Sequence, residues 1–477
     1  METRHFRYKN LASDLEGQIK RGSLRTGERL PSLRNLHYKL GLSLNTIYQA
    51  YMELEALGLI EAQPKSGFFV KDAGWMNIEA PRFNQRPAAP AMVRLSDITN
   101  TVVANSINPD LVPLGASTLS TELMPQKQLV QVIKGMAPAK MIRLLQYEVA
   151  EGAVGLRRQL ASRLLGLIPE ISENDIIITN GCSEAVALAL LATTTSGDVV
   201  AVESPTHFGF LQMLRELGLQ VLELPTDPRH GVVLEGLSQA LQKTKVKACL
   251  LMPNFQNPTG ALMPEDHRQE VVSLLNEKEI PLIEDDIYGE MHFGKSRPGF
   301  LRTWDRKELV ISCSSFSKTL APGFRVGWLV AGRKISERIK RLKAGLSLAS
   351  PSLQQHALAR FLADGSMDRY LRLLRAAVHN QVVKTARAVK DYFPPECRFS
   401  VPMGGIMLWI ELPKWADGIR LYEQALKAGI SIIPGAAFSP ADHYRNYIRI
   451  SCTSPFSERI EKAIETLGEL IGKQNKI

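Results

Sequence analysis

Apolar residues at helical spacing open the chain. Leu11, Leu15 and Ile19 recur every fourth residue between residues 8 and 21, so they share one face of a predicted helix. Ser32 and Ser43 each stand before a further apolar segment, as helix-capping residues do. The pattern therefore predicts three short helices, with a tight turn between the second and the third.

A hairpin and a linker are predicted next. Residues 59–70, LIEAQPKSGFFV, read as two short strands around a Pro/Gly turn, which is a β-wing after a helix-turn-helix. From Asp72 to about Asp110 the composition shifts to Pro, Ala, Asn and Arg without a sustained period. This shift predicts a linker that is semi-extended where proline is dense.

Beyond the linker, short apolar runs alternate with helical stretches. The runs cover residues 176–179, 199–202, 221–224, 248–252, 281–284 and 309–312. Such alternation predicts an α/β domain with a mostly parallel sheet, helices on both of its faces, and ligand sites at the carboxyl ends of the strands.

Composition and charge narrow the class of protein. With 477 residues, 45% apolar and 22% charged, the chain is long enough for two or three globular units. The net charge of +10 suits an anionic partner, and the first 71 residues carry 11 Lys and Arg against 7 Asp and Glu.

Cysteine usage and the N-terminus indicate the compartment. Five cysteines without C-x-x-C spacing argue against a disulfide framework or a zinc site, so we expect no metal. The chain has no signal-peptide pattern and no apolar run approaching the roughly 20 residues that span a bilayer. We expect a cytoplasmic protein that does not enter membranes.

The candidate chemistry centres on Lys318 in SCSSFSKTLAPGFR, where Arg325 follows seven positions later. A lysine in a cation-rich, partly buried pocket loses its proton more easily and can form an imine with an aldehyde, while an arginine holds a phosphate. Taken alone, the stretch is better explained as a Ser-rich loop with a solvated lysine, because most lysines lie at the surface.

Three further motifs follow predicted strands. Asn180–Glu184 opens a helix expected over 185–192, whose free amides would bind phosphate. Asn257 in NPTG can offer an amide over the sheet, although an Asn-Pro turn explains it too. Asp285, with Tyr288 three residues later, can keep a pyridine nitrogen protonated, or can simply cap a helix.

The N-terminal motifs ERLPSLR, NTIYQAY, LEALGLI and QPKSGFFV, in that order, resemble the winged helix-turn-helix of GntR-type transcription regulators. The resemblance implies that the third helix enters the major groove and the wing meets the backbone or minor groove of double-stranded DNA. Leu44 stands where the family often has an Arg, so the resemblance implies no arginine contact to guanine at this position. The implied DNA contacts are Arg34, Asn45, Thr46, Tyr48, Lys65 and Ser66.

The ordered set NPTG, DDIY, S-x-S-K and a late Arg in YIRIS resembles fold-type I aminotransferases that depend on pyridoxal 5'-phosphate, over about residues 110–477. The resemblance implies that Lys318 forms the internal aldimine and shuttles protons, and that Asp285 pairs with the pyridinium nitrogen. It also implies that Tyr288 and Asn257 bind the ring hydroxyl. The implied phosphate ligands are Ser315, Ser317, Arg325, Cys182 and Ser183.

Other site residues follow from the same resemblance. Arg449 would grip a substrate carboxylate, a bidentate task suited to guanidinium, and Tyr147 would reach the phosphate of a neighbouring subunit, which implies a homodimer. His207 stands where the family usually has a ring-stacking Tyr, and the LGASTLS context of Gly115 is not the family's common form. For Trp409 we expect core packing.

A winged helix joined to such a domain resembles the MocR subfamily of GntR regulators. The predicted domains are residues 1–71, a linker at 72–110, and an effector domain at 111–477 with a small subdomain from about 340. The implied function is DNA-binding regulation in which pyridoxal phosphate, an amino acid or an amine is sensed through Lys318. The alternatives are an active aminotransferase with an accessory DNA-binding domain and, less favoured, a purely structural cofactor.

Overall fold

The computed structural model describes most of the chain. The described residues are 7–20, 23–25, 27–56, 59–63, 66–71, 78–84, 87–93, 101–102, 104–105, 108–136, 144–441 and 443–475. In these ranges no helix has the length and apolar character needed to cross a membrane.

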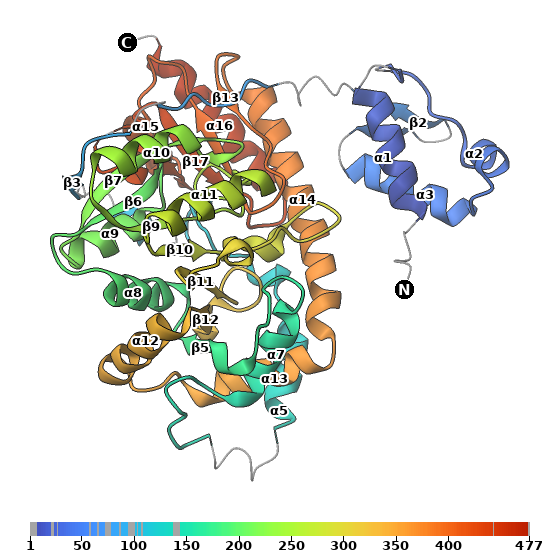
Figure 1. The fold of residues 1–477 in the computed structure, drawn as a ribbon. Coiled ribbons are helices and arrows are strands. Elements are labelled where there is room, and N and C mark those ends of the chain that lie inside the picture. Colours follow the sequence, from blue (N-terminus) through green and yellow to red (C-terminus); the bar gives the residue numbers. More distant parts are fainter. Residues whose placement is uncertain are drawn as a thin grey trace.

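The N-terminal unit has the predicted order of elements. Its helices are α1 (Arg7–Lys20), α2 (Leu33–Leu40) and α3 (Leu44–Ala56), and its hairpin pairs β1 (Ile60–Gln63) with β2 (Gly67–Val70) (Figure 1). Both predicted helix caps are confirmed by hydrogen bonds that their serine hydroxyls accept from backbone amides three residues later, at 3.2 Å and 3.1 Å.

A small core holds this unit together. The predicted stripe of Leu11, Leu15 and Ile19 on α1 is buried against Ile47 and Tyr51 of α3, neither of which is exposed at all. The Tyr51 hydroxyl donates a 2.6 Å hydrogen bond to the carbonyl of Pro31, so the buried phenol is satisfied. These contacts fix α3 across α1 and leave its opposite face free.

A large sheet forms the body of the second unit, and all six predicted runs are strands in it. Its spatial order is β3 (Ala91–Met92), β7 (Gln220–Asp227), β6 (Val199–Ser204), β9 (Val246–Leu251), β10 (Leu282–Asp285), β11 (Val310–Ser315), β12 (Gly327–Val330) and β5 (Ile176–Thr179), with β8 (Gly231–Val232) beside β7. The five strands from β7 to β11 are parallel, and β12 runs against both of its neighbours. The predicted mostly parallel sheet is therefore confirmed.

Helices cover both faces of this sheet, because its strands are apolar on both sides. Val200 and Val202 of β6 face the core that holds α8 (Cys182–Thr193) and α12 (Arg333–Leu346), whereas Ala201 faces α10 (Leu234–Lys243) and α11 (Glu265–Glu277). Figure 1 shows these helix pairs beside the labelled strands. Around the large sheet the described residues also form α5 (Gln126–Lys134), α7 (Val154–Leu164), α9 (Phe208–Glu216) and α13 (Ser352–Ala363).

A second, antiparallel sheet lies in the predicted small subdomain. Its order is β13 (Arg398–Phe399), β14 (Met407–Glu411), β17 (Tyr447–Ser451) and β16 (Ile433–Pro434). The helices around it are α14 (Ser366–Tyr392), α15 (Gly418–Lys427) and α16 (Glu458–Gln474). One short strand of the preceding segment, β4 (Val112–Pro113), pairs with β15 (Ile430–Ser431), so the chain before residue 120 is also attached here.

Parts of the predicted linker pack against this second unit. The amide of Arg82 donates to the Glu411 carboxylate at 2.8 Å, and its carbonyl accepts from the Tyr447 hydroxyl at 3.0 Å. Further along, β3 pairs with β7 at the edge of the large sheet. Asn105 Nδ2 also donates to the Tyr422 hydroxyl at 2.9 Å, so the segment predicted as a semi-extended linker is attached at several places.

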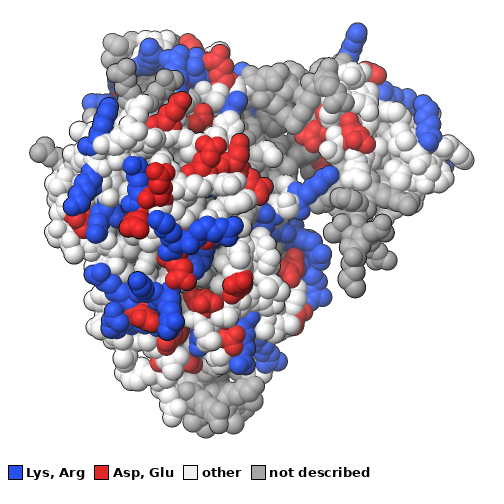
Figure 2. All heavy atoms as spheres, in the orientation of Figure 1, with Lys and Arg blue, Asp and Glu red and all other residues white. Residues whose placement is uncertain are grey.

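Charge is spread over the second unit. Figure 2 shows Lys and Arg interspersed with Asp and Glu on the visible face of the larger body, without one continuous field of a single sign. The net charge of +10 therefore does not mark a binding surface on this face.

Candidate functional site

The predicted site residues meet at the carboxyl edge of the large sheet. Asp285 is the last residue of β10, Lys318 lies in the loop after β11, and Asn257 lies in the loop after β9. Because neighbouring parallel strands end at the same edge, residues that are distant in sequence come together there.

Lys318 lies half-buried among other cations. Its Nζ donates a 2.7 Å hydrogen bond to the carbonyl of Ser117. Burial, aided by the nearby Arg449, lowers the pKa of Lys318 to about 8, although Asp285 acts in the opposite direction. A substantial fraction of this amine is therefore neutral, and so nucleophilic, near physiological pH.

Asp285 is buried at the end of β10. Its Oδ1 accepts a 2.9 Å hydrogen bond from the Ile287 amide, yet burial raises the pKa of Asp285 to about 7. The Cys182 thiol forms a hydrogen bond with this carboxylate, which favours the charged form. Cys182 was predicted to bind phosphate. Because its thiol is directed to Asp285, its backbone amide at the start of α8 is the group that can do so.

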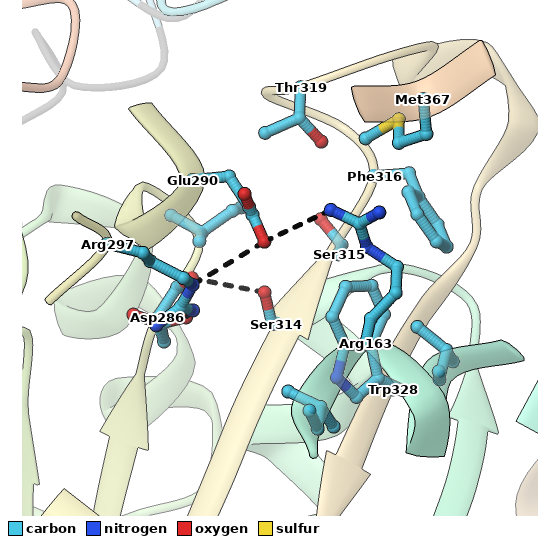
Figure 3. Close-up of a pocket in the computed structure, with 13 residues that line it drawn as sticks. Arg163, Asp286, Glu290, Arg297, Ser314, Ser315, Phe316, Thr319, Trp328 and Met367 are labelled. Carbon is cyan, nitrogen blue, oxygen red and sulfur yellow. Dashed lines mark hydrogen bonds and ion pairs between the residues drawn. The ribbon is translucent and has the colours of Figure 1, made fainter. Parts of the chain in front are cut away.

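A polar network behind this carboxylate was not predicted from the sequence. Asp286 is paired with Arg297, and Glu290 lies 3.5 Å from Arg297 Nε and 3.6 Å from Arg163 Nη2. Figure 3 shows these side chains around a cavity of about 20 Å³, bounded by Ser314 and other β11 residues. Successive strand residues face opposite sides, so only one acid of the DDIY motif can serve the site while its neighbour joins this network.

Arg325 and the start of α8 form an anion cradle. The Arg325 Nη2 donates to the carbonyl of Asn180 at 2.9 Å, and Gly181 makes room for it, since a Cβ there would lie 2.6 Å from the same nitrogen. Ser183 is exposed in the first turn of α8. On the opposite side, the Ser315 hydroxyl accepts from the amide of Ser317 at 3.2 Å. Free helix amides beside a guanidinium suit a phosphate group.

Arg449 is fully buried on β17. Its Nη1 donates to Asn257 Oδ1 at 3.1 Å and its Nη2 to the carbonyl of Gly115 at 2.6 Å, while its Nε has no hydrogen-bond partner among the described residues. Burial lowers the pKa of Arg449 to about 10. None of the ion pairs in the described part of the chain includes Arg449. A buried guanidinium held only by neutral acceptors is ready to receive a carboxylate.

His207 is linked to Arg449 through Asn257. The Asn257 amide nitrogen lies 3.3 Å from His207 Nδ1, and the ring is held edge-on to Phe210 with centroids 5.3 Å apart. Burial, together with the charges of Lys318 and Arg449, lowers the pKa of His207 to about 3. The imidazole is therefore neutral at physiological pH.

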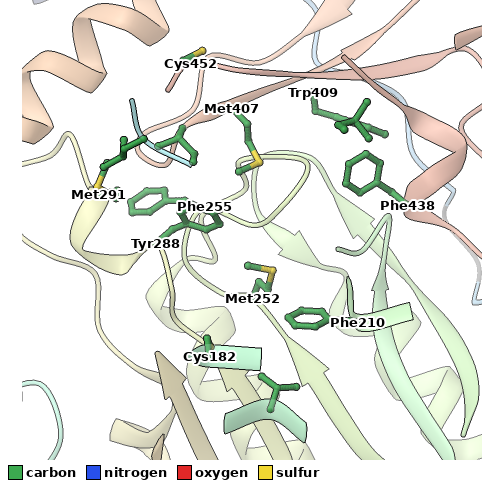
Figure 4. Close-up of a cluster of buried hydrophobic side chains, with 14 of the residues drawn as sticks. Cys182, Phe210, Met252, Phe255, Tyr288, Met291, Met407, Trp409, Phe438 and Cys452 are labelled. Atoms are coloured by element: carbon green, nitrogen blue, oxygen red, sulfur yellow. The ribbon is translucent and has the colours of Figure 1, made fainter. Parts of the chain in front are cut away.

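Aromatic and sulfur side chains close the site toward the small subdomain. Figure 4 shows Tyr288 and Phe255 together near Met291, and Trp409 beside Phe438 at the other end of the same buried cluster. Burial raises the pKa of Tyr288, which is 1% exposed. Trp409 is stacked on Tyr447 with centroids 5.2 Å apart and is 2% exposed, so the core role predicted for it is confirmed.

The remaining predicted residues lie at surfaces. Tyr147 is 86% exposed and stays available for a neighbouring subunit. In the N-terminal unit Arg34 and Asn45 are exposed and Tyr48 is 46% exposed, whereas the Thr46 hydroxyl is engaged with Ser43 Oγ at 2.8 Å. Ser66 is exposed in the wing turn, and Lys65 lies outside the described residues.

Two family models match the chain. The model for aminotransferase class I and II matches residues 109–467, and the model for bacterial regulatory proteins of the gntR family matches residues 7–70. Together they span the two units described above. The first covers the Lys318 site and the second covers the three helices and the hairpin.

Relatives with the same two-part build and solved structures agree. The chain is 36% identical to the HTH-type transcriptional regulator YjiR of Escherichia coli, over 98% of each chain. The α-aminoadipate aminotransferase LysN of Thermus thermophilus, solved with N-(5'-phosphopyridoxyl)-L-leucine, is 26% identical with a TM-score of 0.73, over 81% of this chain and 96% of that one. The kynurenine aminotransferase of Pyrococcus horikoshii is 28% identical with a TM-score of 0.75, over 80% and 96%. The chain therefore belongs to the GntR transcription regulators that carry an aminotransferase class I and II domain, the MocR subfamily, whose effector domain has the fold of pyridoxal-phosphate-dependent enzymes.

Proposed function

We propose that this chain regulates transcription by sensing pyridoxal phosphate, an amino acid or an amine at Lys318. The bound ligand then changes the affinity of the protein for DNA. The observation that carries this proposal is a low-pKa lysine near a buried arginine that pairs with no carboxylate among the described residues, in a chain that also has a winged helix. Both groups are cationic sites kept available for a ligand.

The residues present fit the cofactor that the fold implies. Arg325, the first amides of α8 and the hydroxyls of Ser315 and Ser317 would hold its phosphate, and Asp285 would face its ring nitrogen. When bound, pyridoxal phosphate supplies an aldehyde that captures amines and a ring that withdraws electrons. A positive ring nitrogen beside Asp285 would lower the raised pKa of that carboxyl, so the buried acid suits a cationic partner.

Arg449 favours ligands that carry a carboxylate as well as an amine. A carboxylate would replace the Gly115 carbonyl on Nη2 and satisfy the unpartnered Nε in one bidentate contact. Gly115 is held against Ser431, since a Cβ at that glycine would lie 2.5 Å from the serine hydroxyl. Ligand binding at Arg449 would therefore release the carbonyl of Gly115 and could shift the segment around Gly115, which leads back to the linker and the winged helix.

We further propose that the protein works as a homodimer in the cytoplasm. Tyr147 and Leu145 are both 86% exposed, and large exposed apolar side chains close together in sequence suit burial by a second copy. A dimer would also present two winged helices to two halves of one DNA site.

Replacing Lys318 tests the proposal. Wild-type protein mixed with pyridoxal phosphate should absorb in the visible, and borohydride reduction should leave the cofactor's mass on the chain. Lys318→Ala should lose the covalent species almost completely, because the amine that forms the imine is removed. Lys334→Ala, an exposed lysine on α12, is the matched control and should behave as wild type. A colourless wild type, or labelling that survives in Lys318→Ala, would contradict the proposal.

An active aminotransferase is the second candidate. It is favoured by the presence of Lys318, Asp285 and Arg449 in one site and by relatives named aminotransferases at 27–29% identity. A screen of amino acids, amines and 2-oxo acids separates the two functions. Fast turnover with no effect of the ligand on DNA affinity would support the enzyme, whereas a ligand-dependent change in DNA affinity with slow turnover would support the sensor.

A further inference from the structure

Helix α3 presents an uncharged face to solvent. Leu44 is 45% exposed and Tyr48 is 46% exposed, and Asn45 and Gln49 are exposed beside them. These positions lie one, four and five residues apart, so they form one face at the N-terminal end of the helix. The opposite face is fixed in the core, where Ile47, Ala50, Tyr51 and Leu54 are completely buried.

The first turn of α3 is held rigidly. Ser43 Oγ accepts from the Thr46 amide at 3.1 Å and is paired with the Thr46 hydroxyl at 2.8 Å. Both hydroxyls are thus used in capping, and the side chains of Leu44 and Asn45 leave a fixed turn. Leu44, Asn45 and Gln49 remain as the groups most able to touch base edges.

Positive charge lies on the preceding helix instead. The sequence of α3, LNTIYQAYMELEA, contains no Lys or Arg, whereas Arg34 and Lys39 are exposed on α2. In a helix-turn-helix the N-terminal residues of the second helix read bases, while the first helix crosses the phosphate backbone. The structure therefore separates uncharged base-reading positions from cationic phosphate-binding positions.

The donor and acceptor pattern of the major groove decides what such a face can read. Guanine is read mainly by Arg or Lys, adenine by Asn or Gln through a bidentate pair, and the thymine methyl by apolar side chains. We propose that α3 reads A·T base pairs: Leu44 packs on thymine methyl groups, Asn45 and Gln49 pair with adenine edges, and Arg34 and Lys39 hold phosphates without choosing a sequence. The operator should therefore be A·T-rich at its most constrained positions.

Selection from random duplexes with the full-length protein tests this. Enriched DNA should show A·T pairs at the most constrained positions of each half-site. Replacing one such pair by G·C should weaken binding by about tenfold, as expected for the loss of one good base contact. Guanine or cytosine at those positions, or no enriched motif at all, overturns the proposal.

Three variants test the named residues. Asn45→Ala should relax the selected preference by about tenfold at one position while leaving binding to random DNA unchanged. With Leu44→Arg, the selected motif should gain a preference for guanine at one position next to the retained A·T pairs. Arg34→Ala is the contrasting control: it should weaken all sequences alike and reduce the salt dependence by about one phosphate contact. Because all three side chains are exposed, thermal unfolding should be unchanged. Equal losses on selected and random DNA in Asn45→Ala overturn the assignment, as does a Leu44→Arg motif without new guanine.

Discussion

The two ends of the Asn257 side chain are committed to different partners. Its oxygen accepts from Arg449, which can only donate, so its nitrogen must face His207 Nδ1. The imidazole therefore keeps its proton on Nε2 and acts as an acceptor at Nδ1. This link joins the residue at the ring-stacking position to the residue predicted to bind carboxylates.

Replacing His207 by Phe should separate stacking from this link. A phenyl ring keeps an aromatic surface but removes the acceptor, which frees Asn257 and loosens Arg449. We expect the affinity for an amino acid to fall about tenfold while the affinity for the corresponding decarboxylated amine stays nearly constant, in line with the loss of one hydrogen bond to a charged network. Absorbance titrations of the cofactor-loaded protein measure both affinities.

His230→Phe, at an exposed histidine beside Asp227, is the matched control for this experiment and should leave both affinities unchanged. An equal fall for amino acid and amine in His207→Phe would mean that His207 contributes stacking alone.

The lowered pKa of Lys318 predicts a pH dependence. Only the neutral amine attacks an aldehyde, so the rate of cofactor capture should rise with pH, reach half its plateau near the pKa of about 8, and be about a tenth of the plateau at pH 7. Arg449→Gln removes a nearby positive charge, which should raise the pKa of Lys318 and move the midpoint to higher pH. Stopped-flow absorbance gives the profile. A wild-type midpoint near the ordinary lysine pKa of about 10.4 would rule out this environment.

At the scale of elements, the N-terminal unit is a short series of capped helices on one core. Its stability depends on a few local hydrogen bonds because its core is small. The Ser43 cap is the most consequential of these, since it begins the helix that carries the proposed base-reading face.

Ser43→Ala should therefore destabilise this unit by about 1 kcal/mol, the usual cost of losing a helix cap. Thermal unfolding of the full-length protein should show an earlier transition for the N-terminal unit, with the absorbance of the cofactor unaffected. Ser23→Ala, at an exposed serine outside the helices, should not move that transition. An unchanged transition in Ser43→Ala would show that the core alone positions α3.

The fold was predictable where periodicity was strong. The apolar stripe of α1 and the apolar runs of the central strands can be recognised in the sequence, because burial on one face or on both faces leaves a regular pattern. The strand β12 was not predicted, because GWLV directly follows the lysine motif and reads as part of that loop. The edge strand β3 has two residues, which is too short for any period.

The site was predictable where a motif fixes residue order, and less so where tertiary contacts decide. Lys318, Asp285, Asn257 and Arg449 come together as the motifs indicated. The Asp286–Arg297 network was missed because charges at a strand end carry no sign of which face they take. That the Cys182 thiol is used by Asp285 likewise depends on how α8 packs against β10, which local sequence does not encode.

At the scale of the whole molecule, sensing requires a coupling free energy between the Lys318 site and DNA. An effector that changes DNA affinity by some factor must have its own affinity changed by operator DNA by the same factor, commonly about 5- to 150-fold. We expect this reciprocity in two titrations: duplex with and without effector, and effector with and without duplex. Arg449→Gln should reduce both effects for an amino acid. A shift in one titration without its counterpart would exclude two-state regulation by this site.

Because Arg82 and its neighbours are attached to the small subdomain, only a short stretch of chain connects the DNA-binding unit to the second unit. The Glu79 carboxylate lies 2.7 Å from the Arg398 guanidinium, so the chain meets the small subdomain nine residues after β2 ends at Val70. Six residues separate Lys71 from Ile78, and covalent geometry limits that span to about 25 Å. In a dimer, two such short connections limit how far apart the two winged helices can lie. They therefore set the range of half-site separations that both can bind at once, so spacing as well as base sequence defines an operator.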